Sequence, residues 1–146
     1  MGCFWAKHVH LGPDDIQYLM ERTRYDESEI REFFRGFAQD CPNGKLTPAK
    51  FVDFYRTIFH TGDPEKFCEH AFRAFDRRWA GFLNFRDFVI MWNTITAPDP
   101  KDKLQWLFRI FDINSDGSIT KRELELTLSA IAEMHVGHHP LRKFNE

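Results

Sequence analysis

Long apolar runs are missing from this sequence of 146 residues. A helix that crosses a bilayer needs about 20 consecutive apolar residues, and no segment approaches that length. The N-terminus also lacks the apolar segment of a secretory signal. Cysteine is scarce, with only Cys3, Cys41 and Cys68 and no Cys-x-x-Cys pair, which argues against a disulfide framework or a zinc site. These absences predict a cytoplasmic protein with reduced thiols.

An excess of charge of one sign is missing as well. The 20 Lys and Arg residues nearly balance the 22 Asp and Glu residues, and no basic stripe is visible, so we expect no nucleic-acid binding. The sequence contains no phosphate loop, dinucleotide fingerprint or nucleophile–base constellation, which predicts that the protein is not an enzyme. Aromatic residues are abundant instead: 16 Phe and 4 Trp can supply a core and part of a binding groove.

A repeat runs through the chain, marked by a glycine that is followed two residues later by an aliphatic residue. The pairs are Gly44 and Leu46, Gly81 and Leu83, and Gly117 and Ile119. The glycines are 37 and 36 residues apart, which indicates a repeated supersecondary unit. Apolar residues at i, i+3, i+4 and i+7 beside the glycines predict flanking helices. We therefore predict an all-α fold of helix–loop–helix units.

Capping residues mark where several of these helices begin. A polar residue before a helix can accept a backbone N–H, and a proline fits the first helical position. Asp26 and Glu29 have the spacing of a capping box. The other predicted starts are Thr47-Pro48, Asp63-Pro64 and Asp99-Pro100.

The third loop, residues 112–123, has the residue pattern of a calcium-binding EF-hand. Calcium takes 6–8 oxygen ligands, which an EF-hand loop supplies from fixed positions. The predicted ligands are side-chain oxygens of Asp112, Asn114 and Asp116, the Ser118 carbonyl, a water held by Thr120, and both carboxylate oxygens of Glu123. Gly117 permits the turn, and Ile119 is expected to pair in a short strand with a neighbouring loop. The alternative interpretation is a polar surface turn before a helix.

The first two loops have lost this pattern. In the second, Arg78 and Ala80 occupy the third and fifth ligand positions, and Asp87 replaces the closing glutamate. In the first, Pro42 stiffens the loop and Lys50 occupies the twelfth position. We therefore predict one calcium ion per chain, in the third loop.

Four further motifs carry a family resemblance. They are Met1-Gly2, Cys41-Pro42-Asn43-Gly44, Gly62-Asp63-Pro64 and Lys103-Leu104-Gln105-Trp106. On these motifs the chain resembles the neuronal calcium sensor family, the group of recoverin, frequenin and visinin-like proteins. The resemblance implies a cytosolic calcium sensor, often N-myristoylated, that regulates a membrane-associated receptor kinase, guanylyl cyclase, lipid kinase or channel.

Three features depart from that family. Its second hand usually binds metal, whereas the second loop here does not fit calcium. Its myristoylation motif has Ser or Thr at position six, where this chain has Ala6. Its fourth hand has no counterpart before Glu146. Gly2 and Cys3 are nevertheless the candidate lipidation sites for peripheral membrane association, and an unmodified terminus is the alternative.

These observations divide the chain into four predicted parts. They are an N-terminal segment (1–23), hands one and two (24–96), hand three (97–135) and a C-terminal tail (136–146). Hands one and two are expected to pair, which leaves hand three unpaired and able to form a homodimer. We predict a calcium sensor that regulates its target through a calcium-dependent hydrophobic groove. The alternative is a calcium-independent adaptor with one structural calcium site.

Overall fold

The computed structural model describes residues 9–58 and 62–134, and within these ranges the chain is all-α, as predicted. The helices are α1 (Pro13–Arg22), α2 (Glu27–Asp40), α3 (Pro48–Ile58), α4 (Glu65–Phe75), α5 (Phe85–Ile95), α6 (Pro100–Phe111) and α7 (Lys121–Met134). None of these helices is long and apolar enough to cross a membrane. The candidate lipidation residues Gly2 and Cys3 lie outside the described residues.

The helix starts largely follow the predicted caps. The Glu29 amide donates to the Asp26 carboxylate, and the Asp26 amide donates to the Glu29 carboxylate, both at 2.9 Å. The prediction for α4 was wrong by one residue, because Pro64 precedes the helix and α4 begins at Glu65. Asp63 still serves as a cap, since its carboxylate accepts the Glu65 amide at 3.1 Å. Local capping therefore sets most of the helix boundaries.

Helix α1 lies inside the predicted N-terminal segment and was missed by the sequence analysis. It begins at Pro13, and the Gly12 amide donates to the Asp15 carboxylate at 3.0 Å. Its Leu19 side chain is fully buried, and α1 packs against α2 and α5. The Arg86 guanidinium of α5 forms an ion pair with Asp15 at 2.6 Å. Helix α1 therefore adds apolar residues to the core that hands one and two share.

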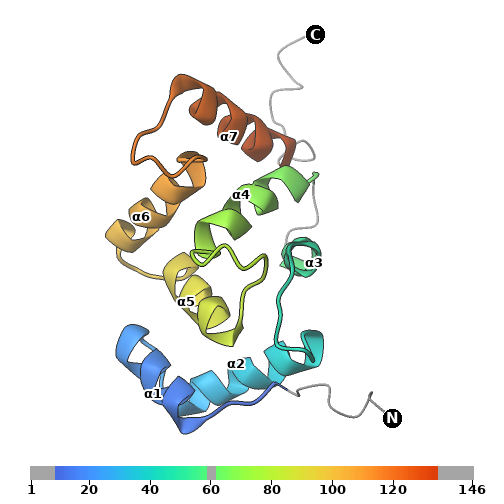
Figure 1. Ribbon diagram of the computed structural model, residues 1–146, viewed down its shortest axis with the longest axis vertical. Helices are drawn as coiled ribbons and strands as arrows, with labels where there is room; N and C mark the ends of the chain where they lie inside the picture. Colours follow the sequence, from blue (N-terminus) through green and yellow to red (C-terminus); the bar gives the residue numbers. More distant parts are fainter. Residues whose placement is uncertain (1–8, 59–61, 135–146) are drawn as a thin grey trace.

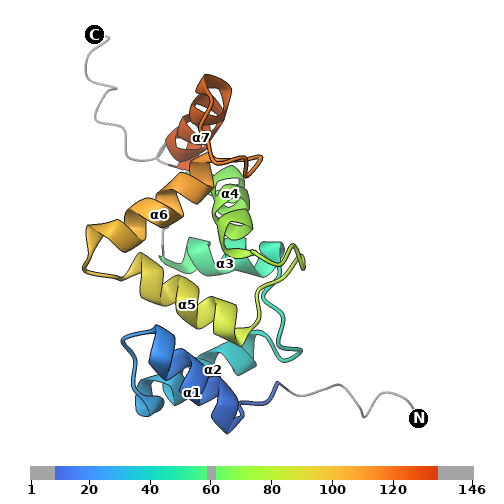
Figure 2. The same cartoon turned by 60° about the vertical axis from the view of Figure 1, so that its left-hand side comes forward.

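Hand one (α2–α3) and hand two (α4–α5) pair through their loops. Leu46 and Leu83 form an isolated antiparallel bridge, with N···O distances of 2.8 and 2.9 Å in the two directions. Figure 1 and Figure 2 show α1 and α2 at one end of the molecule, α6 and α7 at the other, and α4 between α7 and α5. The paired N-terminal lobe of the predicted fold is therefore present.

Hand three (α6–α7) packs on helix α4 of hand two. The Trp106 ring of α6 stacks on Phe75 of α4, with ring centroids 5.3 Å apart. The Arg73 guanidinium of α4 donates to the Ile110 carbonyl at the end of α6, at 2.8 Å. It thereby satisfies one of the carbonyl groups that a helix leaves without an intrahelical partner.

The end of α7 is fastened to the segment that leads into α4. The Asp63 amide donates to the Glu133 carbonyl at 3.1 Å, and the Lys66 ammonium forms an ion pair with the Glu133 carboxylate at 3.0 Å. Gly62 has φ +71°, and a Cβ atom there would lie 2.1 Å from the Met134 carbonyl oxygen. Only glycine fits this contact, because any side chain would meet the backbone of α7.

Truncation of the bridge residue tests this packing. The Leu83 side chain is 0% exposed, so Leu83→Ala should lower the free energy of unfolding by roughly 2–5 kcal/mol through lost burial and a cavity. Leu104→Ala removes the same atoms from a residue that is 62% exposed, and should cost about 0.5 kcal/mol or less. Urea denaturation followed by circular dichroism measures both values. Equal losses would contradict the described core.

Candidate metal centre

The loop 112–123 joins α6 to α7 and begins with a buried carboxylate. Asp112 is 6% exposed, and its two carboxylate oxygens accept the amides of Asp116 and Gly117 at 3.1 and 2.9 Å. These bonds fold the chain back over the first position of the loop. A charged group can be buried here because backbone amides of its own loop solvate it.

Glu123 closes the loop from the first turn of α7. Its carboxylate accepts the Thr120 amide at 2.8 Å and the Asn114 amide at 3.3 Å, and Glu123 in turn donates its amide to the Thr120 hydroxyl at 3.2 Å. The Thr120–Glu123 pair is thus a capping box at the start of α7. The amide bonds from Thr120 and Asn114 lower the pKa of Glu123. The last predicted ligand therefore spans the loop in its ionised form.

Asp116 lies at the exposed side of the same loop. It accepts the amide and the hydroxyl of Ser118 at 2.8 and 2.9 Å, and the side-chain amide of Asn114 at 3.1 Å. The bonds from Ser118 are the main cause of a lowered pKa for Asp116. Hydrogen bonds to an ionised carboxylate favour that form, so Asp116 is available to a cation at neutral pH.

The predicted ligand residues therefore share one loop, and their chemistry fits calcium. Carboxylates, a side-chain amide oxygen and hydroxyl groups are the hard oxygen donors that this ion prefers. Within residues 9–58 and 62–134, no three His, Cys, Asp or Glu side chains already converge on a common metal position.

The predicted pairing of Ile119 was wrong. Across the described ranges the isolated bridge is the one between Leu46 and Leu83, and Ile119 is 39% exposed. The physical reason is that the loops of hands one and two pair with each other, which leaves no partner loop for hand three in the described chain. Ile119 therefore presents an apolar side chain to solvent at the position where the other two hands bury a leucine.

The backbone of the second loop resembles that of the third loop. The Asp76 carboxylate accepts the amides of Ala80 and Gly81 at 3.0 and 2.8 Å, as Asp112 does in the third loop. The fourth loop position has positive φ in both, at 53° for Trp79 and 58° for Ser115. The loss of calcium ligands has therefore left the course of the chain unchanged.

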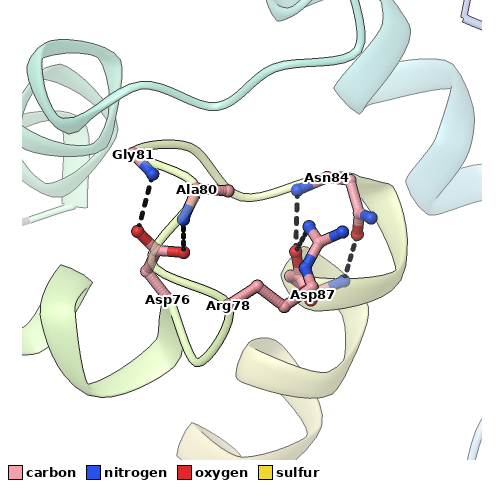
Figure 3. Close-up of polar contacts among 6 residues, drawn as sticks. All are labelled: Asp76, Arg78, Ala80, Gly81, Asn84 and Asp87. Atoms are coloured by element: carbon pink, nitrogen blue, oxygen red, sulfur yellow. Dashed lines mark hydrogen bonds and ion pairs between the residues drawn. The ribbon is translucent and has the colours of Figure 1, made fainter.

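A side-chain cation lies across this second loop. The Arg78 guanidinium, at the third position, forms an ion pair with the Asp87 carboxylate, at the twelfth, at 2.7 Å (Figure 3). Asp87 also accepts the Asn84 amide at 3.0 Å and so caps α5. The guanidinium thus links two positions that a bound calcium ion would link in an intact loop. This internal ion pair is a second reason, besides the missing oxygens, for the predicted loss of calcium binding.

A side-chain cation also lies across the first loop. Lys50 occupies the twelfth position, and its ammonium group donates to the Asp40 carbonyl at 2.6 Å. Each of the two degenerate loops is therefore bridged by a cation from the chain itself, whereas loop 112–123 has no Lys or Arg at its first, third, fifth or twelfth position.

The loops and their paired helices agree with the comparison to known proteins. Residues 42–94 and 100–124 match the family model of an EF-hand domain pair. The chain belongs to the EF-hand family. These matched segments include the loop and second helix of hand one, all of hand two except Ile95, and helix α6 with the loop of hand three. EF-hand membership supports calcium as the metal that this chain binds.

Two known proteins are similar in sequence to this chain over most of its length. The chain is 32% identical to recoverin of Homo sapiens over 129 residues, which are 88% of this chain and 64% of recoverin. It is 32% identical to visinin of Gallus gallus over 124 residues, which are 85% of this chain and 65% of visinin. The resemblance to the neuronal calcium sensor family, to which both relatives belong, is confirmed. The chain spans just under two thirds of the length of these relatives.

The sequence analysis missed the contacts that connect the loops to the rest of the fold. It treated Arg78 only as the loss of a calcium ligand, although a cation at the third position with an acid at the twelfth is a signal for an internal ion pair. It gave no role to Arg73, whose contact with the Ile110 carbonyl depends on how two hands pack.

Rebuilding the second loop tests its assignment. Arg78→Asp, Ala80→Asp and Asp87→Glu together remove the guanidinium and supply oxygens at the third, fifth and twelfth positions. Because the loop backbone already resembles that of the third loop, calcium calorimetry should show one additional ion per chain, with a dissociation constant of about 10⁻⁵ M or tighter. Arg78→Gln alone is the control and should add none. An unchanged stoichiometry in the triple variant would show that more than ligands is missing.

Proposed function

We propose that this protein is a calcium sensor with one calcium site, in loop 112–123. The ligands are Asp112, Asn114, Asp116, Ser118, Thr120 and Glu123. The observation that supports this proposal most directly is the contrast among the three loops. Loops one and two are bridged by Lys50 and Arg78, whereas the third keeps ionised oxygen donors and has no Lys or Arg at the equivalent positions.

A groove between hands one and two supports a protein target. It is a cavity of about 440 Å³ with a mostly apolar lining. Phe37, Leu46, Phe54 and Phe88 provide that apolar surface, and Lys50 is among the polar residues of the lining. An apolar groove of this kind suits the apolar face of an amphipathic helix. We propose a membrane-associated target of the receptor kinase, cyclase, lipid kinase or channel class.

Helix α4 offers a route from the calcium loop to this groove. Arg73 of α4 holds the Ile110 carbonyl, two residues before the ligand Asp112. Burial lowers the pKa of Arg73, while the nearby carboxylates of Glu69, and after it Asp112 and Glu123, oppose that shift. A calcium ion that neutralises the two loop carboxylates and reorients α6 and α7 therefore changes the surroundings of α4, which also packs on α3 beside the groove.

Acylation of Gly2 and Cys3 would bring such a sensor to the cytoplasmic face of a membrane. Two lipid chains give stable anchoring, whereas a single myristoyl chain gives marginal, reversible binding. The intact mass of the protein purified from its own cells decides whether either residue is modified.

Substitution of the closing glutamate tests the calcium site. Glu123→Gln removes one ionised oxygen ligand and the bidentate geometry, and should weaken calcium binding roughly 100-fold or more. Asp87→Asn is the matched control, because it changes the same loop position in hand two and should leave one ion bound per chain. Calorimetry measures both affinity and stoichiometry. Unchanged titration of Glu123→Gln would place the site elsewhere.

The same variant separates a sensor from an adaptor. A sensor should bind an apolar dye more strongly in calcium than in chelator, and Glu123→Gln should abolish this difference. A calcium-independent adaptor with one structural site should show equal dye binding and tryptophan fluorescence in both conditions.

The exposed face of hand three supports a homodimer. Ile119, Leu124 and Leu128 are 39%, 42% and 50% exposed, a concentration of apolar residues that is unusual on a monomer surface. The Leu46–Leu83 bridge is an example of how two hands of this chain pair, and an antiparallel bridge can form around a two-fold axis. We propose that the third hands of two copies pair in this way.

Sedimentation analysis tests this dimer. The calcium-loaded chain should sediment as a dimer, and Leu128→Glu should give a monomer because it places a charge in the apolar interface. Met20→Glu alters a residue that is 47% exposed on α1, and should leave the dimer intact. A calcium-loaded parent chain that is monomeric at high micromolar concentration would exclude the dimer.

A further inference from the structure

A second cavity lies between the loop of hand two and hand three. Its volume is about 360 Å³, and it is separate from the groove described above. Arg77 and Trp79 line it from the second loop, Phe108 and Arg109 from α6, and Asp112 from the calcium loop. The cavity therefore joins a cationic and aromatic surface to the edge of the metal centre.

Two of its guanidinium groups have no anionic partner within the described ranges. Arg78 forms an ion pair, and Arg73 donates to a backbone carbonyl. In contrast, Arg77 and Arg109 make no ion pair and no side-chain hydrogen bond with any described residue. Arg109 is half-buried, and both its burial and the like charge of Arg77 lower its pKa. The carboxylates of Asp76 and Asp112 also line the cavity, but both accept loop amides. An anion between Arg77 and Arg109 would relieve their mutual repulsion.

The aromatic walls of this cavity are not explained by the fold. Trp79 is 70% exposed and Phe108 is 41% exposed. Trp79 has φ +53°, which is unfavourable for a bulky residue, and the equivalent position of the third loop holds Ser115. The loop therefore does not require a tryptophan at this position. An exposed Trp beside two such arginines is the composition of a contact surface.

A peptide suits this site better than a membrane. The surface is concave, whereas a bilayer contacts convex or flat surfaces. Recognition of anionic lipid typically uses clusters of four to eight Lys or Arg, and here the acidic calcium loop lies at the edge of the cavity. The formal net charge of −2 provides no general attraction to an anionic bilayer.

We propose that this cavity binds an acidic segment of a partner protein, with a carboxylate between Arg77 and Arg109 and a neighbouring apolar side chain against Trp79 and Phe108. The contact is independent of the groove between hands one and two. It does not require calcium, but calcium in the adjoining loop adds positive charge beside the carboxylate and strengthens the binding.

Fluorescence anisotropy with a labelled peptide tests the site. The probe is the heptapeptide Ala-Glu-Glu-Phe-Leu-Asp-Ala, and the comparison peptide replaces each acid by its amide. The acidic peptide should bind with a dissociation constant on the order of 10–100 μM, and the amide peptide at least tenfold more weakly. Binding should be roughly threefold tighter, or more, in calcium than in chelator. Equal binding of the two peptides, or weaker binding in calcium, would overturn the proposal.

Matched variants locate the binding. Arg77→Gln with Arg109→Gln should weaken binding of the acidic peptide at least tenfold. Arg31→Gln with Arg35→Gln removes the same charge from exposed residues of α2 and should have no such effect. Equal losses in the two double variants would mean that only the total charge matters, and would overturn the proposal.

A third variant tests the aromatic wall, and a vesicle assay tests lipid as the ligand. Trp79→Asn keeps a residue that tolerates positive φ, so stability should be unchanged or higher while peptide binding falls several-fold. Unchanged peptide binding would remove Trp79 from the site.

Vesicles of phosphatidylcholine and phosphatidylserine at 3:1 test whether the ligand is a membrane. If they bind the parent chain but not the Arg77 and Arg109 variant, and the peptide does not bind, the site belongs to a lipid and the proposal fails.

Discussion

Burial of one apolar face of helix α4 against both hand one and hand three is the constraint on which the arrangement of the three hands depends. Phe72 of α4 meets Phe51 of α3, with ring centroids 5.8 Å apart. One turn later, Phe75 stacks on Trp106 of α6. Residues three apart on a helix project in similar directions, so one apolar face of α4 contacts both hand one and hand three. A helix that serves a single hand would leave one of these aromatic contacts exposed.

The three loops show how an EF-hand can keep its shape without metal. A calcium ion normally draws the ends of the loop together through oxygen ligands. In loop two the guanidinium of Arg78 connects the third and twelfth positions, and in loop one the ammonium of Lys50 reaches back to Asp40. These contacts do not depend on the calcium concentration, because the cation is covalently part of the chain. Hands one and two can therefore keep their arrangement without metal, which fits the proposal that hand three alone binds calcium.

Most of the fold could be predicted from the sequence, because helix periodicity and capping are local. The Asp26–Glu29 box and the loop-to-loop pairing of hands one and two followed from patterns within a few residues or from the repeat. Helix α1 was missed because its buried residues are few and its start is a Gly-Pro pair. Ile119 was assigned a partner because the repeat suggested one, although pairing depends on which loops meet in space.

At the candidate site, the calcium ligands stay a prediction from the sequence, and the structure places the predicted residues in one loop. The oxygen donors of loop 112–123 follow a fixed spacing, so their identities could be read from the sequence. Their hydrogen-bond partners could not, since the same carboxylate can accept a loop amide or contact a metal. The ion pair of Arg78, and the lack of one at Arg77 and Arg109 among the described residues, depend on packing between hands. Adjacent arginines of similar sequence context therefore have different surroundings.

The contact between Gly62 and the backbone of Met134 gives α7 a mechanical role. This helix has 14 residues, so it spans about 20 Å. One end carries Glu123, and the other is joined to the connection between the first two hands by the contacts of Gly62 and Asp63. Helix α7 therefore connects loop 112–123 to residues 62 and 63. If ion binding rotated the first turn of α7, the segment at residues 62 and 63 would move with the far end of the helix. More backbone freedom at residue 62 or 63 would weaken this coupling.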